Sequence, residues 1–271
     1  MKTLSLNQAW NETAAFVKRE ARLLFPIALL LVALPMTAMR LLVPVPAGRG
    51  ELPDPGLWLV ALPVAIIIGM VGNLAIATLA LRRGLSVGEA LSHGLRRMPV
   101  LLVATLLVGL AATAAAFLIL VLFAILFGGG GTPTTADAAR IAVLSMIVIL
   151  PLALYVFSRL MLTTPVAADE PAGPLAIIRR SWQLTRGVVW TLILFIFLVI
   201  LLFLVIGLAV NAVFGILLVA VAGRPDPGSV SALVLLALDA LINTAIGVYM
   251  TVMIARIYAQ LAGTAAGEAA A

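Results

Sequence analysis

The chain lacks cysteine and has few residues that could carry acid–base or metal chemistry. Its 271 residues include one histidine, His93, and only 10% of them are Asp, Glu, Lys or Arg. The absence of cysteine excludes disulfides, thiolate catalysis and cysteine-based metal sites. No HExxH pair or phosphate-binding loop is present. We therefore expect no metal, no cofactor and no enzymatic activity from this chain.

Hydrophobic residues are what the chain has in excess. They make up 64% of the sequence, and the mean hydropathy is +1.24. Soluble domains are about 45–50% apolar, because a folded domain still needs a polar surface. The composition therefore predicts an integral membrane protein, and we expect residues 1–271 to form one membrane domain.

Six apolar runs reach the length of about 20 residues that a helix needs to cross a bilayer. Clusters of glycine and proline separate them at 44–48, 53–56, 128–133 and 223–228. The fold class predicted is all-α, a polytopic bundle of six transmembrane helices. The expected spans are Leu23–Val43, Leu57–Leu81, Val100–Phe127, Ile141–Thr163, Val188–Ala220 and Ser231–Ala255.

Basic residues are distributed unequally between the two sides of these spans. One side carries 13 of the 17 Lys and Arg residues, and the other carries Arg40, Arg49, Arg140 and Arg224. The positive-inside rule then places both termini in the cytoplasm. Residues 1–22 are polar and contain no short apolar core of a cleavable signal peptide. We expect a multi-pass protein of the bacterial inner (plasma) membrane.

Three short basic stretches precede pairs of spans and have amphipathic patterns. They cover residues 1–22, Gly88–Met98 and Gly173–Gly187. Such sequences are typical of helices that lie in the cytoplasmic membrane interface. One interpretation is that they only anchor the topology; the other is that they form a lipid or partner surface. The candidate lipid-headgroup contacts are Arg96, Arg97, Arg179, Arg180, Arg186 and Trp182.

Two of these stretches share a short motif. Ser92-x-x-Leu95-x-Arg97 matches Ser181-x-x-Leu184-x-Arg186, and residues 13–18 are a looser copy. The pattern suggests three repeats of an interfacial helix plus a helical hairpin. The repeat units would be 1–83, 84–170 and 171–271.

Polar residues inside the spans form a second candidate site. Asp239 and Asn243 lie one helical turn apart in the sixth span, and Arg40 and Asn211 are expected at a similar depth. An ionised side chain in a span is costly without a partner. We expect Asp239 to face the bundle interior with Arg40 as its charge partner. Three interpretations stay open: an ion pair that fixes packing, a polar pocket or ion path, and solvation at the outer end.

Four further polar residues have simpler expected roles. His93 lies on the polar face of its stretch, so we expect it to be solvated. Arg159, near the inner end of the fourth span, is expected to extend its guanidinium to the cytoplasm. Asp169 and Glu170 are adjacent, and adjacent side chains diverge. They therefore make a poor acid–base pair.

Residues 159–190 carry a resemblance to a known family. Their sequence runs from Arg159 through Pro165, Glu170, Gly173-Pro174, Arg180-Ser181-Trp182, Leu184 and Arg186-Gly187 to Trp190. It resembles the membrane domain attached to bacterial glycerophosphoryl diester phosphodiesterases, and its stand-alone relatives of unknown function. The resemblance implies an integral membrane domain. The family's catalytic part is a separate soluble barrel with His and Glu metal chemistry, and this chain has no residues to form it.

The first functional hypothesis is a non-enzymatic inner-membrane protein, a lipid-interacting or scaffold module in envelope function. Its expected partners are membrane lipids with anionic headgroups, and a protein partner or a second copy of the chain. Nucleic acid is not expected, since topology and anionic lipid explain basic residues at span ends. The alternative is a small transporter or channel with a polar path near Asp239.

Overall fold

The structure is a computed structural model that describes residues 4–43, 54–82, 84–127, 134–222 and 229–270. Within these ranges every regular element is a helix. The elements are α1 Leu6–Ala28, the π-helical turn η1 Leu29–Ala33, α2 Leu34–Leu42, α3 Trp58–Leu81, α4 Val87–Phe127, α5 Thr135–Leu160, α6 Thr163–Asp169, α7 Pro174–Leu184, α8 Val189–Ala222 and α9 Val230–Ala270.

Six helical stretches of the described chain are long and apolar enough to cross a membrane. They are Leu6–Leu42, Trp58–Leu81, Val87–Phe127, Thr135–Asp169, Val189–Phe214 and Leu233–Gly263. The prediction of an all-α, multi-pass membrane protein is therefore confirmed. The helices also extend beyond several predicted spans, most clearly in α4 and α9.

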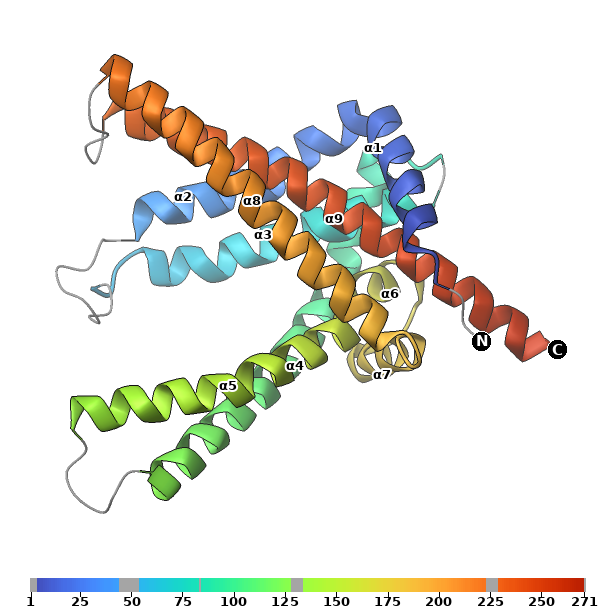
Figure 1. The fold of residues 1–271 in the computed structure, drawn as a ribbon. Coiled ribbons are helices and arrows are strands. Elements are labelled where there is room, and N and C mark those ends of the chain that lie inside the picture. The colour runs from blue at the N-terminus through green and yellow to red at the C-terminus, as the bar shows by residue number, and fades with distance from the viewer. Residues whose placement is uncertain (1–3, 44–53, 83, 128–133, 223–228, 271) are drawn as a thin grey trace.

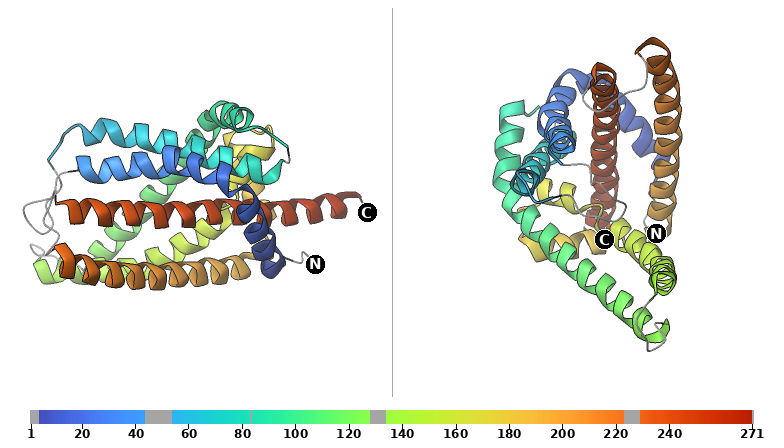
Figure 2. Two further views of the ribbon diagram at one scale, coloured as in Figure 1. Left: turned by 90° about the horizontal axis from the view of Figure 1, so that it is seen from above. Right: turned by 90° about the vertical axis from the view of Figure 1, so that its left-hand side faces the viewer.

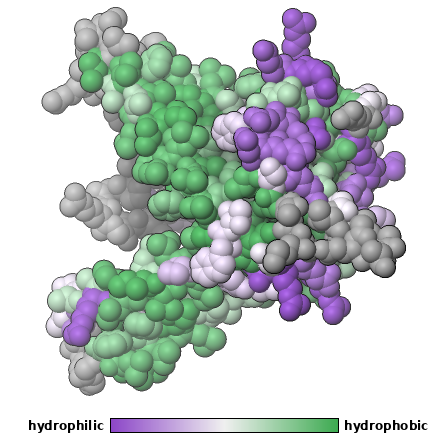
Figure 3. Space-filling view, turned by 45° about the vertical axis from the view of Figure 1, so that its right-hand side comes forward, coloured by the Kyte–Doolittle hydropathy of each residue, from purple (hydrophilic) through white to green (hydrophobic). Residues whose placement is uncertain are grey.

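Both termini lie at one end of the molecule, which we call the terminal end, and the opposite end is the loop end (Figure 1). The hairpin of α4 and α5 diverges from the other spans toward the loop end (Figures 1 and 2). Hydrophilic residues gather at the terminal end, and a hydrophobic band covers the spans (Figure 3). This distribution fits a protein whose middle is solvated by lipid.

The basic stretches differ in form from the prediction of three separate helices. The first is the beginning of α1 and the second is the beginning of α4, so both continue directly into spans. Only the third, α7, is a separate short helix. It is preceded by α6, of which only Thr163 lies in the predicted fourth span.

The residues of the shared motif are not equally buried in its three copies. Ser181 and Leu184 in α7 are buried, and so are Thr13 and Phe16 in α1. In the second copy, however, Leu95 is 59% exposed. The threefold repeat therefore stays a prediction.

The first span contains an irregular segment caused by its prolines. Pro35 has no N–H, so it cannot donate to a carbonyl of the preceding turn. The chain widens into η1 here, and Leu34 N–H donates to Leu29 O in an i to i−5 bond. Gly72 of α3 accepts the bulge: a Cβ there would lie 2.9 Å from Leu31 Cβ. The wide turn and the glycine thus fit each other.

The most buried part of the molecule lies toward the terminal end. Val166 and Ala167 of α6 are fully buried in it, together with Ile177 of α7 and Ile257 and Tyr258 of α9. The helix α6 thus forms the centre of the core, between α3, α4, α7 and α9. This core positions the polar cluster that is described below for the terminal end.

Candidate functional site

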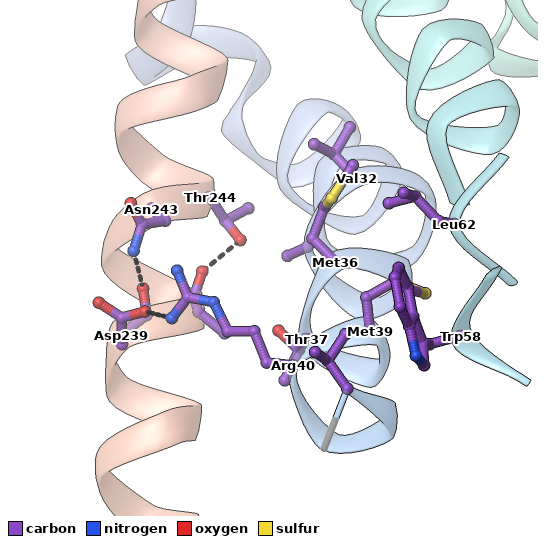
Figure 4. Close-up of a pocket in the computed structure, with 13 residues that line it drawn as sticks. Val32, Met36, Thr37, Met39, Arg40, Trp58, Leu62, Asp239, Asn243 and Thr244 are labelled. Carbon is purple, nitrogen blue, oxygen red and sulfur yellow. Dashed lines mark hydrogen bonds and ion pairs between the residues drawn. The ribbon is translucent and has the colours of Figure 1, made fainter. Parts of the chain in front are cut away.

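The loop end contains a cavity of about 780 Å³ between η1, α2, α3 and α9. Its wall is mostly apolar, and its polar groups come from α2 and α9 (Figure 4). The lining residues are Val32, Ala33, Met36, Thr37, Met39, Arg40, Val43, Trp58, Leu62, Asp239, Ala240, Asn243 and Thr244. We call this space the loop-end pocket. Its volume lies within the range of about 300–1,000 Å³ that is typical of ligand sites.

An ion pair forms the polar edge of the loop-end pocket. Arg40 Nη1 donates to Asp239 Oδ2, which joins α2 to α9 across 199 residues of sequence (Figure 4). The side chains are 61% and 33% exposed, respectively. The pair therefore lies at the surface of the cavity, where both charged groups can meet a further molecule.

Asn243 and Thr244 turn their polar groups back to their own helix. Asn243 Nδ2 donates to Asp239 O over 2.8 Å, and Thr244 Oγ1 donates to Ala240 O over 2.6 Å. The structure thus brings three members of the predicted polar cluster, Arg40, Asp239 and Asn243, to one cavity. The fourth, Asn211, is in α8, but its side chain is outside the described residues.

Toward the terminal end, the pocket gives way to close packing. Ala28, Val248 and Val252 are at most 2% exposed and belong to one apolar cluster. Thr251 Oγ1 donates to Asn73 Oδ1 of α3 over 3.1 Å, so this polar pair joins two helices. Between Asn243 and the terminal end, the polar side chain of Thr251 in α9 therefore serves as a packing contact with α3.

The terminal end contains a second polar cluster, built on the segment that joins α6 to α7. Arg97 of α4 donates through Nε to Ala167 O over 2.8 Å, and through Nη2 to Glu170 O and to Ala172 O, the latter over 3.0 Å. His93 Nε2 lies 2.8 Å from Ala168 O. The prediction that His93 is solvated is therefore wrong, because its helix packs against α6.

The adjacent carboxylates of this segment, Asp169 and Glu170, also bind side chains of neighbouring helices. Tyr258 Oη donates to Asp169 Oδ2 over 2.9 Å and to Glu170 Oε1 over 3.1 Å. Arg180 Nε lies 2.9 Å from Glu170 Oε1, and Arg82 Nε lies 4.0 Å from Asp169 Oδ1. Four helices thus hold residues 167–172, which we call the clamped segment. The sequence analysis missed this cluster, although Glu170 and Arg180 both belong to the motif that it singled out.

Arg159 lies at the junction of α5 and α7. It donates to Tyr155 Oη over 3.0 Å and to Trp182 O over 3.3 Å, and its guanidinium lies 5.1 Å from the centre of the Trp182 ring. Ser181 Oγ donates to Arg159 O over 2.7 Å. Arg159 is therefore held by α5 and α7, and the extension of its guanidinium to the cytoplasmic side stays a prediction.

An apolar cavity of about 560 Å³ between α4 and α5 ends at this junction. Alanines of both helices line its length, and Ile178 and Trp182 of α7 line its end. We call it the hairpin cavity. The face of α7 that carries Ile178 and Trp182 also carries Leu175, which is 71% exposed. The opposite face buries Ile177, Ser181 and Leu184 in the core.

The six predicted headgroup contacts fall into two groups. Arg97 and Arg180 are engaged inside the protein, as described above. Arg96, Arg179 and Arg186 have exposed side chains, and Trp182 is 40% exposed beside the hairpin cavity. Lipid contact by these exposed residues stays a prediction.

Comparison with known families matches residues 135–269 to the membrane domain of glycerophosphoryl diester phosphodiesterase. Through this half, the chain belongs to that membrane-domain family. The match includes α5 to α9, and with them the clamped segment and Arg159. A search of curated proteins and a search of solved structures gave no match.

Membership of this family agrees with the resemblance predicted from residues 159–190. Within the membrane domain, Glu170, Arg180 and Ser181 now have a structural reason, because they fix α7 against α5 and α6. The match is to the membrane domain and not to the catalytic phosphodiesterase domain.

Proposed function

We propose that this protein is a non-enzymatic membrane module that binds an anionic phospholipid at α7. The observation that carries the proposal is the hairpin cavity, which ends at Trp182 beside Arg159 and the exposed arginines of α7. An acyl chain fits an apolar cavity, and a phosphate is bound well by guanidinium groups. The occupied site would lie in the cytoplasmic leaflet, where anionic lipids attract basic residues.

The rigidity of α7 supports this role. Its inner face is buried, and the clamped segment before it is held by Arg97, Arg180 and Tyr258. The helix therefore presents Arg179 and Arg186 from a fixed position. A fixed position lowers the entropic cost of binding a lipid. Such a module could serve as a scaffold for envelope proteins that need a defined lipid environment.

The test is native mass spectrometry of the protein extracted with its own lipids. Changing Arg179 and Arg186 to Gln should remove a retained anionic phospholipid, whereas Lys18→Gln with Arg22→Gln should not. The control pair removes the same charge from exposed positions of α1. Equal lipid retention in the two double variants would overturn the proposal.

A small transporter or channel is the second candidate, and the loop-end pocket is the polar site that it would use. Flux through reconstituted liposomes that is lost in Asp239→Asn would support it. Flux in the wild-type protein that does not depend on Asp239 would argue against this path.

A further inference from the structure

We propose that the loop-end pocket binds a zwitterionic phospholipid, with the headgroup phosphate on Arg40 and the headgroup ammonium on Asp239. This site is separate from the α7 site and does not depend on it. Phosphatidylethanolamine has the required chemistry, because a short linker joins its phosphate to a primary ammonium group.

Charge complementarity is the first argument. The pocket carries one cation and one anion side by side, so its net charge is zero. A purely anionic ligand would be attracted by Arg40 but repelled by Asp239. A purely cationic ligand would be attracted by Asp239 but repelled by Arg40. A ligand with both charges can satisfy both side chains. Guanidinium–phosphate and carboxylate–ammonium hydrogen bonds are charge-assisted and therefore strong.

Free bonding capacity is the second argument. Arg40 offers five N–H donors, and Nη1 donates to Asp239. Oδ2 of Asp239 accepts that bond, and Asn243 bonds to the backbone carbonyl of Asp239 and not to its carboxylate. The exposure of 61% and 33% leaves room for further partners. The ion pair is therefore open to a headgroup that contacts it from the cavity side.

The apolar wall is the third argument. Val32, Met36 and Leu62 line the pocket behind the ion pair (Figure 4). Methionine side chains adapt their shape to apolar ligands. Trp58 stands at the rim, and its Nε1 donates to Asp54 O over 2.8 Å. Tryptophan with one polar edge is typical of the membrane interface. The wall suits the first methylenes of an acyl chain, while the headgroup stays at the rim.

The closed inner side of the pocket favours a bound lipid over a conducted ion. Ala28, Val248 and Val252 are packed directly beyond it toward the terminal end. An ion path would need a continuous polar or hydrated passage there, whereas the polar side chains described in this region, Thr251 and Asn73, bond to each other and join two helices. The wide turn η1 supplies Val32 and Ala33 to the wall, and π-turns are frequent at functional sites. A cavity that ends inside the bundle fits a ligand that enters from the side.

The experiment is native mass spectrometry of delipidated protein titrated with phosphatidylethanolamine or phosphatidylglycerol, in the Arg179→Gln, Arg186→Gln background that removes the anionic-lipid site proposed at α7. This parent protein should bind phosphatidylethanolamine more tightly. Asp239→Asn should reduce that preference by about tenfold, because the ammonium loses its partner. Arg40→Gln should weaken both lipids. Met36→Trp, which fills the pocket and leaves the ion pair intact, should weaken both lipids as well.

Wild type is the control for site identity. It should bind phosphatidylethanolamine as the parent protein does and should bind additional phosphatidylglycerol, because α7 lies at the terminal end. Thermal unfolding in detergent identifies variants that fail to fold, and Met36→Trp tests the pocket without removing a charge. Equal binding of both lipids to the parent protein, or a preference that survives both Asp239→Asn and Met36→Trp, would overturn the proposal.

Discussion

At the residue scale, Arg96 and Arg97 show how neighbours with one charge differ in role. Arg96 is exposed, whereas Arg97 donates to three backbone carbonyls of the clamped segment. Sequence reasoning grouped both as headgroup contacts, since it could not place α6 beneath α4. Arg97 instead gives hydrogen-bond donors to backbone carbonyls in the last turn of α6 and just beyond its end.

Arg97→Gln should therefore destabilise the protein, and Arg96→Gln should not. Loss of charge-assisted hydrogen bonds to buried carbonyls is expected to cost at least about 2 kcal/mol. Thermal unfolding in detergent measures both variants. Because the two variants lose the same charge, equal melting temperatures would show that Arg97 does not hold the clamped segment.

At the element scale, glycine sets the distance between α3 and α4. A Cβ at Gly94 would lie 3.0 Å from Val71 O and 3.4 Å from Ala75 N, which are backbone atoms that cannot rotate away. Small residues at such positions let membrane helices approach closely. The predicted amphipathic stretch 88–98 is therefore a packed part of α4, and its buried face is set by Gly94 and Ala90.

Gly94→Ala should separate α4 from α3 and destabilise the bundle by about 1–3 kcal/mol, as overpacking does. Gly109→Ala is the matched control in the same helix, since nothing lies within 4 Å of a Cβ there. Alanine should be tolerated at Gly109, because it favours the helix more than glycine. The measurement is the unfolding temperature in detergent. A Gly94→Ala protein as stable as the control would show that the contact relaxes freely.

At the scale of the whole molecule, the distributions of charged and of hydrophobic residues both distinguish the terminal end from the loop end. Both termini, α7 and the clamped segment lie at the terminal end, and the ion pair of Arg40 and Asp239 lies near the other (Figures 1 and 4). The positive-inside rule predicts that the terminal end faces the cytoplasm.

Single-cysteine labelling tests this orientation, and the cysteine-free chain needs no background substitutions. In intact cells stripped of their outer membrane, a membrane-impermeant thiol reagent should label Asp54→Cys and not Gly173→Cys. After the membrane is opened, both should react. Both positions are exposed in the structure, so access depends on the side of the membrane. Labelling of Gly173→Cys alone in intact cells would show that the topology is the reverse of the predicted one.

The sequence by itself determined the class of protein, the six spans and the family resemblance. These follow from composition and from the length of apolar runs, which are local properties that each segment carries without its neighbours. The proximity of Arg40 and Asp239 also followed from a local count, because rise per residue places both near one depth in the membrane.

Only the tertiary structure decided which polar side chains form hydrogen bonds or ion pairs within the protein. The clamped segment depends on Arg97, Arg180 and Tyr258, which come from three helices separated by up to 161 residues. By hydropathy alone, Arg96 and Arg97 are equivalent, although Arg97 is hydrogen-bonded to the clamped segment and Arg96 is exposed. Burial and hydrogen bonding depend on which helices pack together, and that packing is a property of the whole bundle, which no single segment contains.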